Sequence, residues 1–265
     1  MNKFYIQIVF FLLSVSVYLN NKTLATEPAS GKTTKTKSKN SYATSEEIYE
    51  KNKELLCTKP EEIKNAEKLM NEATIHLIDH AKSSYKRVGE SSLYKAFLYK
   101  KKHDDNTDVV KLIYRKNDPN KYNKIIGKLW DPDIKNLVDP RSTKRKIARV
   151  YNPNLVIIQQ RYKDSIFGRW KYFYALAKKV QISEDTTVIA MTSANINDDH
   201  PSDKEYKNTI IENANLFTTE IDSEEDIKKG KLTKTFLNIG GYIIKKNEEY
   251  VLITYVGSIN GHTIF

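Results

Sequence analysis

Apolar positions divide the chain into three regions. Residues 4–19 are almost entirely apolar, and residues 26–44 carry almost no apolar side chain. From residue 45 onward, apolar residues recur with the spacing of helices and strands. This pattern predicts one α+β domain over residues 45–265, preceded by an N-terminal segment and a linker.

Two helices open the predicted domain. A short one is expected over residues 45–56 and a long one from Thr58 to about Lys82. Thr58 can cap the long helix, Glu61 can complete a capping box, and Pro60 suits the first turn. The apolar stripe of this helix consists of Ile63, Ala66, Met70, Ala73 and Leu77.

Alternating apolar residues then predict an antiparallel meander interrupted by one helix. The expected strands cover residues 93–101, 108–115, 147–151, 155–163, 170–180, 187–193, 232–245 and 250–256. The inserted helix starts at Asp118-Pro119 and ends at Trp130-Asp131-Pro132. Such a sheet is expected to curve and to cover one face with a helix.

The N-terminus has the organisation of a secretory signal peptide. Lys3 precedes the apolar segment, and Thr23-Leu24-Ala25 is a small-x-small cleavage pattern. We expect residues 1–25 to be removed, because the apolar run is short for a membrane anchor. Residues 26–44, rich in lysine, are predicted to be a flexible basic linker.

Charge and cysteine content narrow the class of protein. The net charge is +11, but only seven of the 44 basic residues are arginine, the residue that nucleic-acid sites favour. We therefore expect a lysine-rich solvated surface, or else attraction to anionic lipid, and no nucleic-acid partner. Cys57 is the sole cysteine, which excludes an intramolecular disulfide.

No catalytic motif is present, so the sequence predicts no enzyme, cofactor or metal site. His76 and His80 have the spacing of zinc ligands but lack the following glutamate and a third ligand. We expect them to be partly exposed helix residues. Asp198, Asp199, His200 and Asp203 are expected to form a solvated turn.

One predicted strand carries three large rings on one face. Trp170, Tyr172 and Tyr174 alternate with Phe173 and Ala175. This face suits an ordinary core or a cavity for an amphipathic ligand, and the pattern leaves both open.

The segment 121–265 resembles a START lipid-transfer domain, a helix-grip fold in which a curved antiparallel sheet wraps a long C-terminal helix around a lipid. The resemblance is carried by Leu129-Trp130-Asp131, Gly168-Arg169-Trp170, Gly240-Gly241-Tyr242-Ile243-Ile244 and Leu252-Ile253-Thr254-Tyr255-Val256. The order and spacing of these segments match.

Nearly the whole chain resembles the Fam-a proteins of rodent malaria parasites. The residues that carry this are 1–25, Ser45-Glu46-Glu47-Ile48-Tyr49-Glu50, Leu129-Trp130-Asp131-Pro132-Asp133, Val150-Tyr151-Asn152-Pro153-Asn154-Leu155-Val156, Phe167-Gly168-Arg169-Trp170-Lys171-Tyr172 and Ile210-Ile211-Glu212-Asn213-Ala214-Asn215. The resemblance implies a secreted protein of the parasitophorous vacuole or host cell that moves phosphatidylcholine between membranes.

The resemblance also implies site residues. Asp131 matches the headgroup aspartate of phosphatidylcholine-binding START domains, but the family's arginine partner is replaced by Gly127. The family's closing C-terminal helix has no counterpart before Phe265, so an open groove along strands 155–163, 170–180 and 187–193 is expected unless the helix 58–82 covers it. The expected lipid contacts are Trp130, Asp131, Arg161, Trp170, Tyr172, Tyr174 and Met191.

Two functions remain open at this point. The first is a lipid-binding and probable lipid-transfer protein whose partners are a phospholipid and membrane surfaces. The second is a surface or interaction protein of the infected cell that keeps the scaffold without transport.

Overall fold

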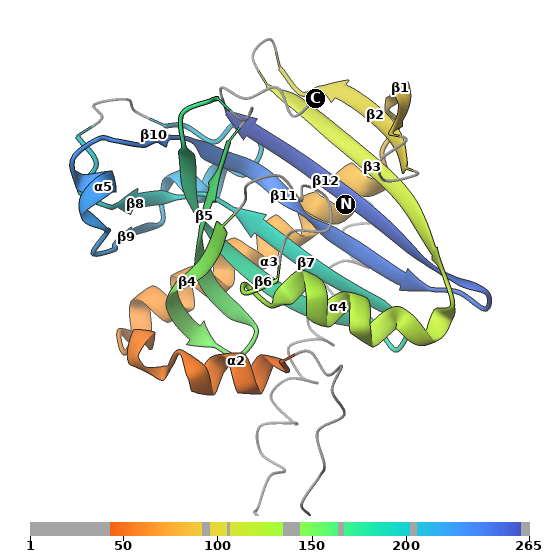
Figure 1. Cartoon of the computed structure of the whole chain (residues 1–265), viewed down its shortest axis with the longest axis horizontal. Coiled ribbons are helices and arrows are strands. Elements are labelled where there is room, and N and C mark those ends of the chain that lie inside the picture. Colours follow the sequence, from red (N-terminus) through yellow and green to blue (C-terminus); the bar gives the residue numbers. More distant parts are fainter. Residues whose placement is uncertain are drawn as a thin grey trace, which may run out of the picture. The chain divides into compact units, whose positions relative to one another are not determined.

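The computed structural model describes residues 43–91, 96–104, 107–134, 144–163, 167–201 and 206–260 (Figure 1). The predicted signal peptide, almost all of the linker and the residues after Asn260 lie outside this description. The described residues belong to one compact unit that spans residues 41–265.

A large curved sheet is the centre of this unit (Figure 1). Its strand order is β1-β2-β3-β12-β11-β7-β6-β5-β4, and all neighbours along this path are antiparallel. The strands are β1 Lys86–Ser91, β2 Ala96–Lys102, β3 Asp108–Asn117, β4 Lys144–Asn152, β5 Leu155–Tyr162, β6 Lys171–Ser183, β7 Thr186–Thr192, β11 Phe236–Lys246 and β12 Tyr250–Asn260. Two-residue β10 (Thr233–Lys234) adds a parallel pairing to β6.

The predicted strands are found, but their predicted order as a continuous meander is wrong. β3 does not pair with the next strand in the chain: it pairs with β12, so that the last hairpin lies between the β1–β3 and β4–β7 runs. β1 was not expected, because Lys86-Arg87-Val88-Gly89-Glu90-Ser91 has one large apolar residue and no period-two pattern.

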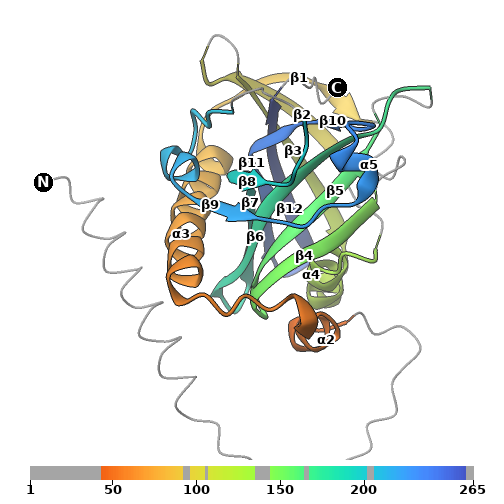
Figure 2. The same cartoon turned by 90° about the vertical axis from the view of Figure 1, so that its left-hand side faces the viewer.

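Helices α3 and α4 lie on opposite sides of the sheet (Figure 2). α3 spans Pro60–Lys82 and α4 spans Tyr122–Trp130, close to the predicted bounds. α2 (Ser45–Lys51) is followed by the short 3₁₀ turn η1 (Lys53–Leu55), which divides the predicted helix 45–56. Pro60 occupies the first turn of α3 as expected, but Lys59 is the N-cap residue and the Thr58–Glu61 capping box does not form.

Alternation along the strands gives the sheet two buried faces. The α3 face includes Tyr172, Tyr174, Leu176, Val188 and Ala190, which pack with Leu69, Met70 and Leu77 of α3. The α4 face includes Phe173, Ala175, Ile189, Met191 and Tyr242, which pack with Ile125, Leu129 and Trp130 of α4. Both faces therefore form core in the described part of the chain.

The polar-looking stretch between β7 and β11 also covers the α3 face. It contains the parallel pair β8 (Asn195–Asn197) and β9 (Thr218–Glu220), the 3₁₀ turn η3 (Glu212–Asn215) and the short helix α5 (Glu225–Lys228). Ile196, Ile210, Ile211, Phe217 and Ile227 from this stretch are buried in the same cluster as α3. The open groove expected on the aromatic face is therefore absent among the described residues, since α3 and this stretch fill it.

Candidate functional site

The C-terminal end of α4 places two of the predicted site residues inside the α4 face. Trp130 and Asp131 are 8% and 9% exposed, and the main-chain N–H of Asp131 still donates to Gly127 at 2.9 Å. The helix stops here because Pro132 disfavours a helical conformation in the residue before it. Asp131 Oδ1 accepts a hydrogen bond from the Asp133 N–H at 2.9 Å, the local bond of an Asx turn.

Arg145 brings a positive charge to Asp131 from strand β4. Its Nη2 donates to the main-chain oxygen of Asp131 at 2.9 Å. Burial lowers the pKa of the Arg145 guanidinium, while Tyr242 and Asp131 oppose this shift. Within the described residues this is the guanidinium's single hydrogen bond, although an arginine has five N–H donors. The remaining donors suit an anionic group such as a phosphate.

Two buried polar atoms on the same face have no hydrogen-bond partner among the described residues. They are the Tyr114 hydroxyl and Trp130 Nε1. Burial and the neighbouring Tyr242 raise the pKa of Tyr114, so its hydroxyl stays protonated at neutral pH and remains a donor. Buried polar groups are nearly always paired, so these two donors are exceptions on this face.

We call Tyr114, Trp130, Asp131, Arg145 and Tyr242 the interior polar cluster. It draws on β3, α4 and its end, β4 and β11, segments that are far apart in the sequence. Met191, another predicted contact, is buried on the same α4 face, where β7 places it opposite Gly240. An apolar surface with a few convergent donors is the general form of a site for an amphipathic ligand.

Tyr172 and Tyr174 lie on the opposite face, so the expectation that they share a site with Trp130 and Asp131 is wrong. The Tyr172 hydroxyl donates to Asp198 at 2.7 Å. The Tyr174 hydroxyl accepts from Gln159 at 2.6 Å and contacts Ser223 at 2.9 Å. Both rings are buried against the α3 side, where their polar ends are already satisfied.

Arg161 is also on the α3 face and is fully engaged by protein carboxylates. Its Nη1 and Nη2 reach the two Asp226 oxygens at 2.6 and 3.1 Å, and Nη2 lies 3.1 Å from Glu224. A bidentate pair of this kind fixes the position of α5 against β5. The sequence analysis expected Arg161 to contact lipid. In the structure its guanidinium instead anchors the β7–β11 stretch to β5.

Trp170 precedes β6 and lies between two lysines. Lys144 Nζ is 5.6 Å and Lys163 Nζ 5.2 Å from the centre of a Trp170 ring. The ring is only partly buried, at the border of the α3-side core. Trp170 is therefore separated from the interior polar cluster as well.

The expectations for Asp198 and His80 were wrong. Asp198 is not in a solvated turn: it is 1% exposed and accepts from Lys234 at 2.5 Å in addition to Tyr172. His80 is buried, with Nδ1 2.9 Å from the Tyr85 hydroxyl, whereas His76 is partly exposed as expected. Among the described residues, no group of three or more histidine, cysteine or acidic side chains is placed to hold a metal ion.

Arg145 is the site residue that the sequence analysis missed. The predicted strand 147–151 began too late: β4 starts at Lys144, which places Arg145 on the same face as Ile147. The stretch 144–146 reads Lys-Arg-Lys and looks like a solvated basic run.

None of the helices in the described ranges is both long enough and apolar enough to span a bilayer.

Comparison with known proteins finds a match in structure but not in sequence. No known protein family and no curated protein matches the sequence. Human StAR-related lipid transfer protein 5 is similar with a TM-score of 0.53 and 8% identity, over 76% of this chain and 84% of that one. Human STARD10 gives a TM-score of 0.48 and 12% identity, over 72% of this chain and 68% of that one. The similarity to the first structure shows that this chain has the START-like helix-grip fold.

Proposed function

We propose that this protein binds a phospholipid on the α4 face of its sheet and carries it between membranes. The observation that supports this most directly is Arg145, whose guanidinium reaches the interior with donors to spare beside Asp131. The unpartnered Tyr114 hydroxyl and Trp130 Nε1 supply two further donors on the same face. Together they can hold the phosphate of a headgroup, while Met191 and Phe173 provide apolar contacts for the acyl chains.

The proposed lipid is phosphatidylcholine-like. Its phosphate pairs with Arg145, and its quaternary ammonium packs on the rings of Trp130 and Tyr242, since cations are attracted to aromatic faces. Asp131 contributes a negative charge to the ammonium side. The chain has no catalytic role in this scheme: binding and release of an intact lipid need no bond to break.

The proposed cellular setting follows the resemblance to the Fam-a family. The N-terminal sequence 1–25 supports secretion, and the proposed destination is the parasitophorous vacuole or the host cell. Detection of a mature N-terminus at Thr26 by peptide mapping would support this route. A mature protein that retains residues 1–25 would contradict it.

Native mass spectrometry of the purified protein tests lipid binding. We expect a co-purifying phospholipid on the wild-type chain and loss of about 10- to 100-fold in affinity for Arg145→Gln, since a hydrogen bond to a charged group contributes about 1.5–3 kcal/mol. Arg115→Gln is the matched control, because Arg115 is exposed and stacks on Tyr250 at 4.6 Å. Equal lipid binding by both variants would remove Arg145 from the site, and absence of lipid from the wild type would favour a scaffold without transport.

A further inference from the structure

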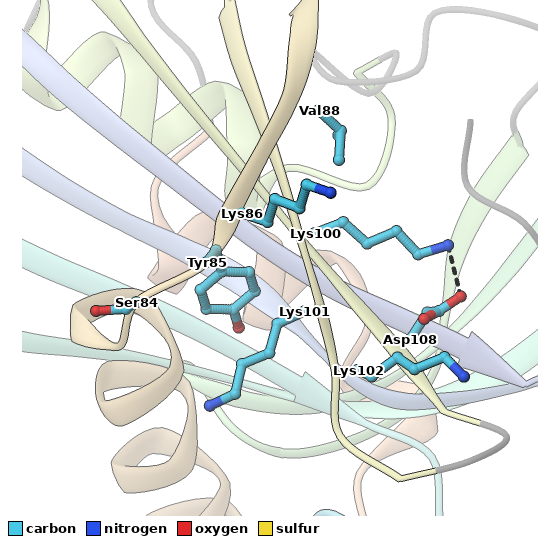
Figure 3. Close-up of a pocket in the computed structure, with 8 residues that line it drawn as sticks. All are labelled: Ser84, Tyr85, Lys86, Val88, Lys100, Lys101, Lys102 and Asp108. Carbon is cyan, nitrogen blue, oxygen red and sulfur yellow. Dashed lines mark ion pairs between the residues drawn. The ribbon is translucent and has the colours of Figure 1, made fainter.

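A hollow of about 430 Å³ lies at the edge of the sheet, away from the interior polar cluster (Figure 3). Its lining comes from the start of β1, the end of β2 and the start of β3: Ser84, Tyr85, Lys86, Val88, Lys100, Lys101, Lys102 and Asp108. Figure 3 shows Lys86, Lys100 and Lys102 extending to the same side as Asp108, while Lys101 extends to the other side, toward Tyr85. The strands therefore gather positive charge at one hollow.

The positive charge of this hollow is largely uncompensated. Lys100 pairs with Asp108 at 2.6 Å. In the described parts of the chain, Lys86 and Lys102 have no ion-pair partner, although both are exposed. Asp108 Oδ1 is buried and, among the described residues, accepts no hydrogen bond. The hollow thus offers ammonium groups for an anion.

Further cations surround the hollow on the α3 side. Lys111 reaches the Ala81 and Ser83 carbonyl oxygens at 3.2 and 2.8 Å, and its Nζ is 4.3 Å from the Tyr85 ring centre. Burial lowers the pKa of His80 to about 4, and the neighbouring Lys101 and Lys111 add to this shift. His80 is therefore neutral at pH 7, and Lys101 and Lys111 carry the positive charge on this side of the hollow.

Apolar and aromatic side chains lie beside these cations. Val88, which lines the hollow, is 50% exposed. Phe97 is 41% exposed on the other face of β2, where the Arg87 guanidinium stacks 4.4 Å from its ring centre. Large exposed apolar side chains next to lysine and arginine are typical of surfaces that enter the headgroup region of a membrane. A site for a free anion in water would gain nothing from Val88.

We propose that the β1–β2 edge docks on an anionic membrane surface and holds one lipid headgroup in the hollow. Lys86, Lys100 and Lys102 bind the acidic part of the headgroup. Val88 contacts the boundary between headgroups and acyl chains. This inference goes beyond the proposed interior lipid site, because docking at the edge does not require lipid uptake on the α4 face.

Vesicle flotation tests the docking surface. We expect the full chain to bind vesicles of phosphatidylcholine mixed with phosphatidylserine far better than phosphatidylcholine alone, and to lose binding as salt screens the charges. Lys86→Ala with Lys102→Ala should weaken binding about 25-fold, since each surface lysine contributes roughly a factor of five. The matched control is Lys116→Ala with Lys246→Ala, exposed lysines on β3 and β11 whose net charge change is the same.

Three results would overturn the proposal. Equal weakening by both double variants would mean that net charge alone attracts the protein. Tighter binding to a nucleic-acid homopolymer than to the mixed vesicles would assign the cations to another partner. Val88→Asp changes an exposed residue, so it should leave the fold intact. If this variant binds vesicles as well as the wild type, Val88 does not contact the bilayer. Native mass spectrometry on the same variants separates this question from the interior site, because we expect lipid loading to be unchanged by Lys86→Ala with Lys102→Ala.

Discussion

At the residue scale, Glu62 shows how one carboxylate joins three distant segments. It accepts from Arg149 Nη1 at 2.7 Å, from the Tyr151 hydroxyl at 2.9 Å and from Thr219 Oγ1 at 2.8 Å. Burial alone would raise the pKa of Glu62, but these hydrogen bonds outweigh it and hold the pKa below its usual range. α3, β4 and β9 therefore meet at a charged group whose partners are all protein atoms.

We expect Glu62→Gln to destabilise the fold by about 3 kcal/mol at neutral pH, because it leaves Arg149 without its ionic partner in a largely buried place. For a domain of this size the melting temperature should fall by about 6–12 °C. Glu61→Gln is the matched control, since Glu61 is exposed on the first turn of α3. Calorimetry that finds similar melting for both variants would contradict the structural role of Glu62.

Lowering the pH should destabilise the fold by protonating carboxylates that, like Glu62, are hydrogen-bonded in the folded protein. The pKa of Glu224 is lowered from 4.5 to about 2: burial opposes the shift, and hydrogen bonds from Lys146 and Gln159 exceed it. A carboxylate whose pKa is lowered on folding stabilises the protein above its unfolded pKa and loses this contribution as the pH falls through its folded pKa. We therefore expect melting temperature to decline from about pH 4.5 to about pH 2, and Glu224→Gln to flatten that decline. An unchanged slope in the variant would show that other groups dominate.

Residue-level prediction from the sequence succeeded where a local rule applied and failed where partners were distant. Asp131 could be placed because a helix end and a proline fix it. Arg161 and Tyr172 were assigned to the wrong face because strand alternation groups residues by face but does not say which helix covers that face. Their partners Asp226 and Asp198 lie in a stretch that looks solvated by composition, and only the fold brings them together.

At the element scale, the packing of α3 on the sheet depends on a glycine. Gly241 of β11 has a φ of +150°, and a Cβ there would lie 2.1 Å from the Ile189 oxygen and 2.7 Å from Leu77 Cδ2 of α3. The nearest clash is with the main chain of the neighbouring strand β7, and Leu77 of α3 adds a second, so no side chain fits at this point. The pair Gly240-Gly241 was visible in the sequence, but these close contacts are visible only in the structure.

We expect Gly241→Ala to destabilise the domain by at least about 2 kcal/mol, since an added methyl group in a packed core forces strands and helix apart. Gly89→Ala is the control, because nothing lies within 4 Å of a Cβ at Gly89 on β1. Chemical denaturation of the two variants measures the difference. A similar midpoint for both would mean that α3 shifts without cost and does not hold the sheet face closed.

At the scale of the whole described domain, the register of the sheet places two strand connections at the same end of the sheet. Each connection, called a corner below, carries both apolar and basic side chains. The β2–β3 connection, with Lys102 opposite Asp108, and the β5–β6 connection, with Tyr162 opposite Lys171, both leave the sheet there (Figure 1). The first corner carries the hollow, and the second carries Phe167, which is 98% exposed, and Trp170 between Lys144 and Lys163. A flat membrane could contact both corners at once.

This arrangement makes Phe167 the test of how the domain approaches a bilayer. Transfer of a phenylalanine side chain out of water contributes roughly 1.5–3 kcal/mol when complete, so Phe167→Ser should weaken binding to mixed phosphatidylcholine and phosphatidylserine vesicles about tenfold or more. Its stability should stay within about 0.5 kcal/mol of the wild type, because an exposed ring supports no core. Leu56→Ser is the control: Leu56 is 37% exposed and forms a bridge with Val150 near the end of β4, at the opposite end of the sheet. If Leu56→Ser weakens vesicle binding as much as Phe167→Ser, the domain does not approach the membrane by the end that carries Phe167, and the proposed orientation is wrong.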